Sequence, residues 1–138
     1  MSTEENKAIA NRVVEAINHR DVALLDELVA ADGIEHAAPP GMPPTLETAK
    51  QYILMLATAL PDFKYTVEYT VAEGDKVAQR LTGSGTMQGD FMGMKATGKS
   101  ATWTETHFSR FANGKLVEHW ANVDQVGMLQ QLGLMPGG

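Results

Sequence analysis

Residues 101–124 read ATWTETHFSRFANGKLVEHWANVD, two alternating runs joined by the pair Asn113-Gly114. An Asn-Gly pair between alternating runs is the strongest short-range signal for a β-hairpin, because both residues tolerate the positive φ angles of a type I′ turn. The sequence therefore predicts strands over residues 99–112 and 115–124. With a two-residue loop, four pairs are predicted to lie opposite each other: Phe111–Leu116, His107–Trp120, Glu105–Asn122 and Trp103–Asp124.

This register gathers aromatic and polar side chains on one face of the hairpin, because side chains alternate along a strand. The face carries Trp103, Glu105, His107, Glu118, Trp120, Asn122 and Asp124. Large aromatic rings beside convergent polar groups are typical of a small-molecule pocket. Burial of a carboxylate beside such rings raises its pKa toward the range of general acid–base catalysis. We therefore expect the pocket on this face.

Alternative roles stay open for three of these residues. Asp124 stands directly before a helical pattern, so it is a helix N-cap, a general acid/base, or both. Glu105 and His107 either line the pocket or lie on a wet face. The predicted register leaves about 13 Å along the strand between His107 and the level of Asp124, so a direct pair of the two requires a bulge or a bent hairpin.

The opposite face of the hairpin is predicted to form an interface between subunits. It carries Thr102, Thr104, Thr106, Phe108 and Arg110 on the first strand and Val117, His119, Ala121 and Val123 on the second. This face is too apolar to be fully wet, and large exposed apolar patches mark interfaces. We expect a homodimer or a homotetramer.

Two further strands are predicted upstream of the hairpin. Residues 63–71 alternate strictly, and the predicted inward face consists of Phe63, Tyr65, Val67, Tyr69 and Val71. After a turn at Glu73-Gly74-Asp75, residues 76–87 form the next strand. Arg80 lies in the middle of this strand, where it either pairs with an acidic group of the pocket or substrate or lies on an exposed face.

Helices are predicted before these strands. An apolar stripe predicts a helix over residues 3–18. Asp21 is the expected N-cap of a short second helix that Gly33 ends, and Thr45 caps a third helix that runs through Leu60. Helices followed by antiparallel strands indicate an α+β fold. We expect a cone with its pocket between the helices and a curved sheet.

The connecting segments complete this outline. The stretch HAAPPGMPPT, residues 36–45, contains four prolines and is predicted to be a loop. His36 opens this loop and lies either at the mouth of the pocket or on the surface. A short last helix is expected over residues 125–132, ended by Gly133. The four histidines lack zinc-site spacing, so we expect no metal site.

The stretch GMKATGKS, residues 93–100, matches the phosphate-binding pattern G-x-x-x-x-G-K-[ST]. A working site of this kind follows a buried parallel strand and opens a helix, whereas here an alternating run follows. We therefore predict a hairpin loop without a nucleotide site. In this loop Phe91, Met92 and Met94 either form a flap over an apolar pocket or pack in the core.

The composition of the 138 residues is typical of one globular domain, residues 1–138, with 43% hydrophobic and 20% charged residues. With a net charge of −6, which repels phosphate backbones, we expect no nucleic acid partner. No signal peptide and no membrane-length apolar run are visible, so we expect a cytoplasmic protein that binds no membrane. The chain contains no cysteine.

The run GTMQGDFMGMKATGKS and the later run RFANGKLVEHWANVDQVGMLQQLG resemble the SnoaL-like polyketide cyclases of the NTF2-like superfamily. Agreement extends to the NHRD turn after the first helix, to Ile34-Glu35-His36 and to LPDFKYTVE. The best motif is GKLVEHW followed by Asp124. Where relatives often carry a histidine after the Gly-Thr pair, this sequence has Met87 and Gln88, so the resemblance assigns no acid–base residue there.

The resemblance implies an α+β barrel that encloses a pocket, cofactor-independent chemistry and dimerisation through the sheet. Characterised members close a ring by intramolecular aldol condensation, with an aspartate as general acid/base that corresponds by motif to Asp124. Three hypotheses follow: such a cyclase acting on a small hydrophobic polyketide-like carbonyl compound, a non-enzymatic binding module, or a related hydrolase or isomerase. The candidate site residues are Asp124 and His107 as catalytic groups, with Glu105, Trp103, Trp120, Asn122, Arg80, His36, Phe91 and Met92 around the substrate.

Overall fold

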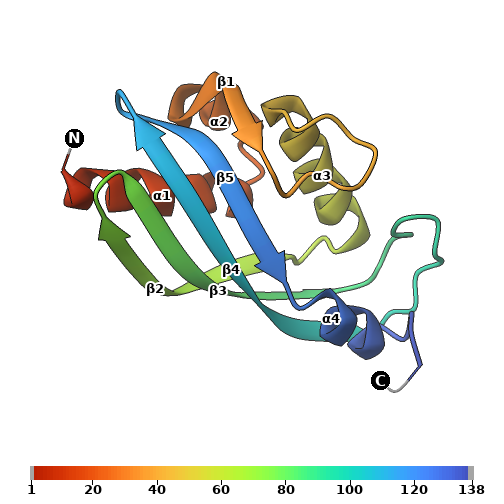
Figure 1. Cartoon of the computed structure of the whole chain (residues 1–138). Helices are drawn as coiled ribbons and strands as arrows, with labels where there is room; N and C mark the ends of the chain where they lie inside the picture. The colour runs from red at the N-terminus through yellow and green to blue at the C-terminus, as the bar shows by residue number, and fades with distance from the viewer. Residues whose placement is uncertain (1, 137–138) are drawn as a thin grey trace.

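A five-stranded mixed sheet with helices packed against one face makes up the fold (Figure 1), and the computed structural model describes residues 2–136. The elements are α1 (Thr3–Asn18), α2 (Val22–Leu28), β1 (Val29–Glu35), α3 (Leu46–Ala59), β2 (Lys64–Glu73), β3 (Lys76–Thr86), β4 (Ser100–Ala112), β5 (Lys115–Val123) and α4 (Gln125–Gln131). The strand order is β1-β5-β4-β3-β2, and only β1 and β5 are parallel among these neighbours. The α+β prediction is confirmed. Within residues 2–136, no helix has the length and apolarity needed to cross a bilayer.

Local caps set the helix boundaries. Ser2 and Glu5 form a capping box at the start of α1, in which each side chain accepts the other residue's N–H at 3.1 Å. Thr45 and Asp124 cap α3 and α4 through their side-chain oxygens. The predicted helices over residues 3–18, from Thr45 to Leu60 and over residues 125–132 are confirmed to within one residue.

Residues 29–35 form a strand, whereas the sequence predicted a helix that ends at Gly33. This strand, β1, pairs in parallel with β5, and Glu35 lies beside His119 in that register. A Cβ atom at Gly33 would lie 3.0 Å from the carbonyl oxygen of Ala30 and 3.4 Å from that of Val117. Glycine here fits between the backbone of β1 itself, at the irregularity between Val29 and Ile34, and that of β5, and it does not end a helix.

A bulge in β5 shifts the register of the hairpin. Phe111 pairs with Leu116 as predicted, but the next pair is Arg110 with Glu118, which leaves Val117 as an extra residue. A β-bulge bends its strand and increases the local twist. The bulge therefore lets the hairpin curve around the helices.

The bulge also reverses the two faces of β5 beyond it. His107 now pairs with Ala121, and Phe108 pairs with Trp120. The predicted pairs His107–Trp120, Glu105–Asn122 and Trp103–Asp124 are therefore wrong. Because a one-residue slip moves every side chain to the other face, His119 turns toward the helices and Trp120 turns away from them.

A second bulge interrupts β2 between Val67 and Tyr69. Tyr65 is buried and Val67 packs against the core, but Tyr69 and Val71 are 70% and 60% exposed. The prediction that these alternating residues share one inward face is wrong for the last two. The outer face of the sheet is correspondingly richer in apolar side chains.

The main core fills the space between α1, α3, α4 and the inner face of the sheet. Its fully buried members include Leu60, Leu81, Met87, Phe91 and Leu132. Gly83 makes room for the Trp103 indole, since a Cβ atom at Gly83 would lie 2.6 Å from the ring. The side-chain amide of Gln131 bonds to the N–H and the carbonyl of Thr102, both at 2.9 Å, and so continues the sheet where β5 has ended.

Candidate functional site

A cavity of about 380 Å³ lies between α1, α3 and the inner face of the sheet. Its walls are mainly apolar and include Val14, Ile17, Ile53, Leu56, Phe63 and Leu81. The proline loop contributes Ala37, Ala38, Pro39 and Pro40 to the lining. The volume falls at the lower end of the range for small-molecule sites, and apolar walls with few polar groups are typical of them.

The main polar feature of the cavity is the buried carboxylate of Glu105. Its Oε1 accepts hydrogen bonds at 2.7 Å from the Tyr65 hydroxyl and from His107 Nε2. Its Oε2 accepts the Trp103 indole N–H at 2.7 Å. Burial is the largest single influence on the pKa of Glu105 and acts to raise it. The hydrogen bond from His107, the charge of His107 and the hydrogen bonds from Trp103 and Tyr65 together outweigh burial, so the pKa of Glu105 is lowered.

Behind Glu105, a chain of short contacts continues through two histidines to a second carboxylate. His107 Nδ1 lies 2.8 Å from His119 Nε2. His119 Nδ1 lies 2.8 Å from Glu35 Oε1 and 2.9 Å from its Oε2. The order Glu105–His107–His119–Glu35 spans β4, β5 and β1. We call these four residues the relay chain.

Backbone pairing explains how the relay chain is assembled. Alternation along β4 turns Glu105 and His107 inward together. The β5 bulge brings His119 to the same face, and the parallel register sets Glu35 beside it. The His36 N–H donates to the His119 carbonyl at 2.9 Å, which fixes the end of β1.

Two tyrosines face the same part of the cavity. Burial and the neighbouring Glu105 charge raise the pKa of Tyr65 well above its usual value. The same two causes raise the pKa of Tyr52 to about 12. Both hydroxyls therefore stay protonated at neutral pH. Among residues 2–136, no hydrogen-bond partner is found for the Tyr52 hydroxyl, so it remains a donor for a bound molecule.

Three of the predicted pocket residues lie together at the cavity. Trp103, Glu105 and His107 all line it, and Trp103 and Glu105 are buried. Asn122 and Met92 also contribute to the lining, although both are exposed. Phe91 does not line the cavity but is fully buried in the core. In the loop after β3, Met92 thus reaches the cavity, whereas Phe91 packs in the hydrophobic core.

Other predicted pocket residues lie on the outer face of the sheet, outside the cavity lining. Trp120 stacks on His36 with ring centroids 4.8 Å apart and a 6° interplanar angle. His36 Nε2 also contacts Glu118 Oε2 at 2.7 Å, and Arg110 Nε donates to Glu118 Oε1 at 2.9 Å. The hydrogen bonds from His36 and Arg110 lower the pKa of Glu118. This cluster joins the end of β1 to the hairpin.

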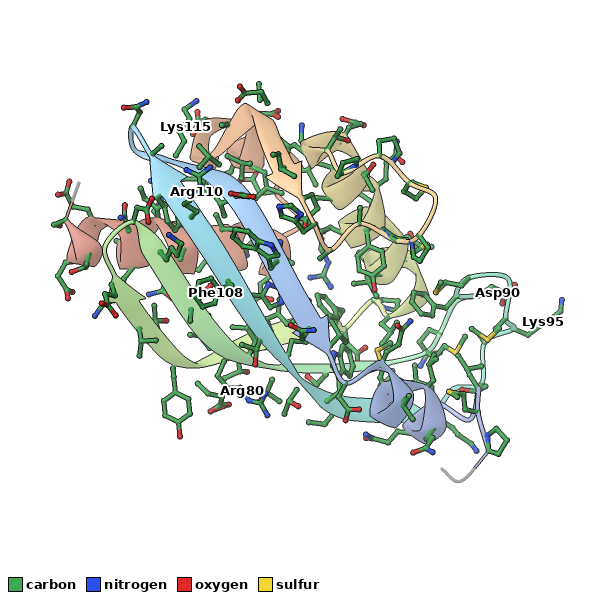
Figure 2. All side chains as sticks on the ribbon, viewed as in Figure 1. Arg80, Asp90, Lys95, Phe108, Arg110 and Lys115 are labelled. Carbon is green, nitrogen blue, oxygen red and sulfur yellow. The ribbon has the colours of Figure 1, made fainter. Side chains whose placement is uncertain are left out.

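Arg80 also lies on the outer face, where it is exposed and donates to Thr106 Oγ1 at 3.1 Å. Phe108 and Arg110 of β4 lie further along the same outer face of the sheet (Figure 2). The prediction that Arg80 reaches the pocket is therefore wrong, and its alternative, an exposed strand face, is correct. Its charge requires no buried partner.

Asp124 is an exposed N-cap at the rim of the cavity. Its Oδ1 accepts the Gly127 N–H at 3.0 Å, and its own N–H donates to the Thr104 carbonyl at 3.0 Å. Its neighbours Val123 and Gln125 line the cavity, but Asp124 itself does not. The predicted capping role is confirmed, and the carboxylate is directed at the first turn of α4.

The stretch 93–100 leads directly into β4 and opens no helix. Gly93 and Gly98 have φ angles of 79° and 74°, as expected of turn residues. Figure 2 shows Lys95 at the tip of this loop, pointing away from the rest of the molecule. The resemblance to a phosphate-binding loop is confined to the sequence pattern.

His119, Glu35, Tyr65 and Tyr52 belong to the site but were not predicted as functional residues. No local signal marks the bulge that turns His119 inward. Glu35 was missed because β1 was not recognised as a strand. Residues 2–136 contain no group of three or more His, Asp or Glu side chains arranged to hold a metal ion.

The family model described as SnoaL-like polyketide cyclase matches residues 7–132. The chain belongs to this family. IdmH from Streptomyces antibioticus, a candidate polyketide cyclase, is 34% identical, with a TM-score of 0.82 over 93% of this chain and 98% of its own. AclR from Streptomyces galilaeus, a candidate hydroxylase, is 30% identical, with a TM-score of 0.88 over 99% and 86%.

TsrD from Streptomyces laurentii shares the fold at 24% identity, with a TM-score of 0.87 over 98% of this chain and 99% of its own. These likenesses confirm the predicted NTF2-like architecture of the family. A comparison with curated proteins finds no match. Because similar structures carry both cyclase and hydroxylase names, the family alone does not fix one reaction.

Proposed function

We propose that this protein is an acid–base enzyme that closes a ring in a small, neutral, mainly apolar, polyketide-like carbonyl compound by an intramolecular aldol-type step. The observation that carries the proposal is the relay chain, a hydrogen-bonded run of two carboxylates and two imidazoles at the wall of an apolar cavity. Membership of the SnoaL-like family supports it. Groups of this kind transfer protons efficiently near neutral pH.

An intramolecular aldol step needs a proton to be taken and returned, and nothing else. A base removes a proton from the carbon beside a carbonyl. The resulting enolate carbon forms a bond to a second carbonyl carbon, and the new alkoxide takes up a proton. Substrate and product are isomers, so the step consumes no further reactant. The relay chain serves as the acid/base, and one positioned group of this type contributes roughly 10²–10⁴-fold in rate.

The Tyr52 hydroxyl is the proposed hydrogen-bond donor to the enolate oxygen. It lines the cavity and remains protonated because its pKa is raised to about 12 by burial and by Glu105. A fixed donor in a site that excludes water stabilises developing negative charge more than it would in water. Asn122 at the rim is a further donor within the lining.

The charges of the lining favour a neutral substrate. Glu105 and Glu35 both face the cavity, and none of the lining residues that the structure describes is Lys or Arg. A free carboxylate or phosphate on the substrate would meet like charge without a compensating cation. We therefore propose a ketone or an ester as the substrate and not a free acid.

Asp124 is the second candidate for the acid/base. The family resemblance assigns it this role, and its neighbours Val123 and Gln125 line the cavity. Its own carboxylate is exposed and engaged in the cap of α4, which favours the relay chain instead. A binding module without catalysis remains the alternative function.

A proton-exchange assay tests the proposed function without knowledge of the natural substrate. Aryl ketones and aryl β-keto esters are first screened for a rise in melting temperature, since a ligand that binds the native state stabilises it. Binders are then incubated with the protein in D₂O, and loss of the α-proton is followed by ¹H NMR. We expect exchange faster than in buffer, abolished by His107→Asn. Tight binding without any exchange would support the binding module.

A further inference from the structure

The relay chain has three links, and each link requires one proton. The links join His107 Nε2 to Glu105, His107 Nδ1 to His119 Nε2, and His119 Nδ1 to Glu35. Each is a hydrogen bond only if one proton lies between its two atoms. Two neutral histidines beside two ionised carboxylates supply two protons. The geometry therefore requires a third proton in the chain, whichever of the four groups carries it.

The surroundings of the chain favour this third proton. The titratable groups that face it are Tyr65 from β2 and Tyr52 from α3, in addition to its own two carboxylates from β4 and β1. Both tyrosines are neutral, as argued above. Gln79, Ser109 and Thr48, the other polar residues of this region, carry no charge. Without a Lys or Arg in the described lining, a proton is the available counter-charge for two carboxylates.

The two ends of the chain differ in their access to a bound molecule. At the inner end, Glu105 accepts bonds from three side chains, and its side chain is 5% exposed. At the outer end, Glu35 lines the cavity and its side chain is 16% exposed. Its Oε1 accepts the Ala37 N–H and the closer contact from His119, whereas Oε2 has, among residues 2–136, only the longer 2.9 Å contact to His119. Glu35 Oε2 is thus the least engaged acceptor of the chain.

We propose that Glu35 is the catalytic residue that takes the proton from the substrate and returns it. His119, His107 and Glu105 form a relay behind Glu35, and the whole relay chain holds three protons, one more than two neutral histidines supply. This proposal rests on the proposed function. His119 is a positioning residue, because it acts on the substrate through Glu35.

The proton balance of the step is closed within the site. Glu35 Oε2 takes the α-proton, so the chain holds four protons and its net charge changes from −1 to zero. The chain's hydrogen bonds shift to share this proton, while the enolate carbon attacks the second carbonyl. Glu35 then gives a proton to the new alkoxide, and the chain returns to three protons. No oxidant, reductant or cofactor enters the step.

The stored proton is tested on the free protein by NMR of ¹⁵N-labelled histidine at pH 7. Glu35→Gln should bring the chain from three protons to two, so the His107 and His119 nitrogens should move from shifts that include imidazolium character to those of neutral imidazoles. Glu118→Gln is the matched control, because Glu118 contacts His36 on the outer face in the same manner and should leave these signals unchanged. Neutral shifts for both histidines in the wild-type protein, together with ¹³C carboxyl shifts of Glu35 and Glu105 at their ionised values, would overturn the stored proton.

The catalytic role is tested by α-proton exchange with a ketone that binds the wild-type protein. Glu35→Gln should retain binding and lose at least about a hundredfold in exchange rate, Glu35→Asp should recover part of it, and Glu118→Gln should exchange at the wild-type rate. His119→Asn should lower the rate and change its pH profile while leaving the dissociation constant of the ketone within a few-fold.

The outcomes separate this proposal from the proposed function. Full exchange by a folded Glu35→Gln protein, together with loss in His107→Asn, would overturn the role of Glu35 and leave the proposed function standing. Absence of exchange in the wild-type protein would overturn the proposed function and the role of Glu35 with it. In either case, the NMR experiment on the free protein decides whether the relay chain holds a third proton.

Discussion

The Tyr65 hydroxyl donates a 2.7 Å hydrogen bond to Glu105 Oε1, and both residues are buried. A hydrogen bond to a charged group contributes about 1.5–3 kcal/mol. Tyr65→Phe leaves the ring in place but removes this donor, so we expect the free energy of unfolding to fall by about that amount at pH 7. Urea denaturation followed by circular dichroism measures the change.

Tyr52→Phe is the control for this substitution. Tyr52 faces the same cavity, but among the described residues its hydroxyl has no hydrogen-bond partner. We therefore expect a loss well below that of Tyr65→Phe. Equal losses in the two variants would show that the Tyr65–Glu105 bond does not stabilise the fold.

Asp62 links the start of β2 to the end of β3 in a pH-dependent manner. Its carboxylate accepts the Thr86 N–H at 2.7 Å and the Thr86 hydroxyl at 2.9 Å, and the bond from the N–H is the main cause of its lowered pKa. A carboxyl with a lower pKa in the folded state stabilises the fold above its unfolded pKa and loses this effect as the pH falls. We expect Asp62→Asn to destabilise the protein at pH 7.

The difference between wild type and Asp62→Asn should shrink as the pH falls below about 4, the unfolded pKa of an aspartate. Denaturant unfolding at pH 7, 5 and 3.5 measures it. Ser100→Ala is a useful reference, because Ser100 also bonds to the Thr86 hydroxyl but does not titrate. A difference that stays constant over this range would contradict the assigned role of Asp62.

The sequence predicted the elements whose signals are local. The capping residues Ser2, Thr45 and Asp124 stand where the helices begin, and Asn113-Gly114 turns the hairpin with φ angles of 53° and 78°. That Glu105 and His107 share one face of β4 with Trp103 also followed from strict alternation, although the sequence left open whether both line the pocket. These features depend on few neighbours in the chain, so pattern and propensity suffice.

The parts that were missed depend on contacts between distant segments. β1 is a strand because β5 lies beside it, and Val117 is an extra residue because the hairpin must curve around the helices. Because of this single bulge, His119 lies at the cavity, where the predicted register had placed Trp120. The relay chain could therefore not be assembled from the sequence, although both of its β4 residues were identified.

Gly83 and Trp103 lie on adjacent strands, and the indole covers the glycine. A Cβ atom at Gly83 would lie within 2.6–2.8 Å of three indole atoms. Gly83→Ala should therefore displace Trp103 and lengthen its hydrogen bond to Glu105. Overpacking of this kind costs about 1–3 kcal/mol in stability. We expect a lower melting temperature and a changed tryptophan emission spectrum, whereas Ser84→Ala on the outer side of the same strand should leave both nearly unchanged.

The exposed apolar side chains of the outer sheet face support the proposed homodimer or homotetramer. Phe108 is 42% exposed, and Tyr69 and Val71 are 70% and 60% exposed on the same outer side of the sheet. Contiguous exposed apolar surface is typical of an interface. We expect sedimentation velocity at micromolar concentration to show a dimer or tetramer, and Phe108→Asp to dissociate it.

Leu54→Asp is the matched control for the interface. Leu54 is 46% exposed on α3, away from the outer sheet face, so its replacement should leave the assembly intact. A wild-type protein that sediments as a monomer would exclude the proposed interface. Dissociation by Leu54→Asp and not by Phe108→Asp would place the interface elsewhere.

Asp124 offers a direct choice between a cap and an acid/base. Its carboxylate is exposed and caps α4 through the Gly127 N–H, so we expect its main contribution to be structural. Asn caps a helix about as well as Asp, whereas Ala costs about 1 kcal/mol. Asp124→Asn should thus keep stability and α-proton exchange within a few-fold of wild type, and Asp124→Ala should lower the free energy of unfolding by about 1 kcal/mol. A folded Asp124→Asn protein that binds the ketone but exchanges at least about a hundredfold more slowly would instead make Asp124 the base. The relay chain would then be left with a role in binding or orienting the substrate.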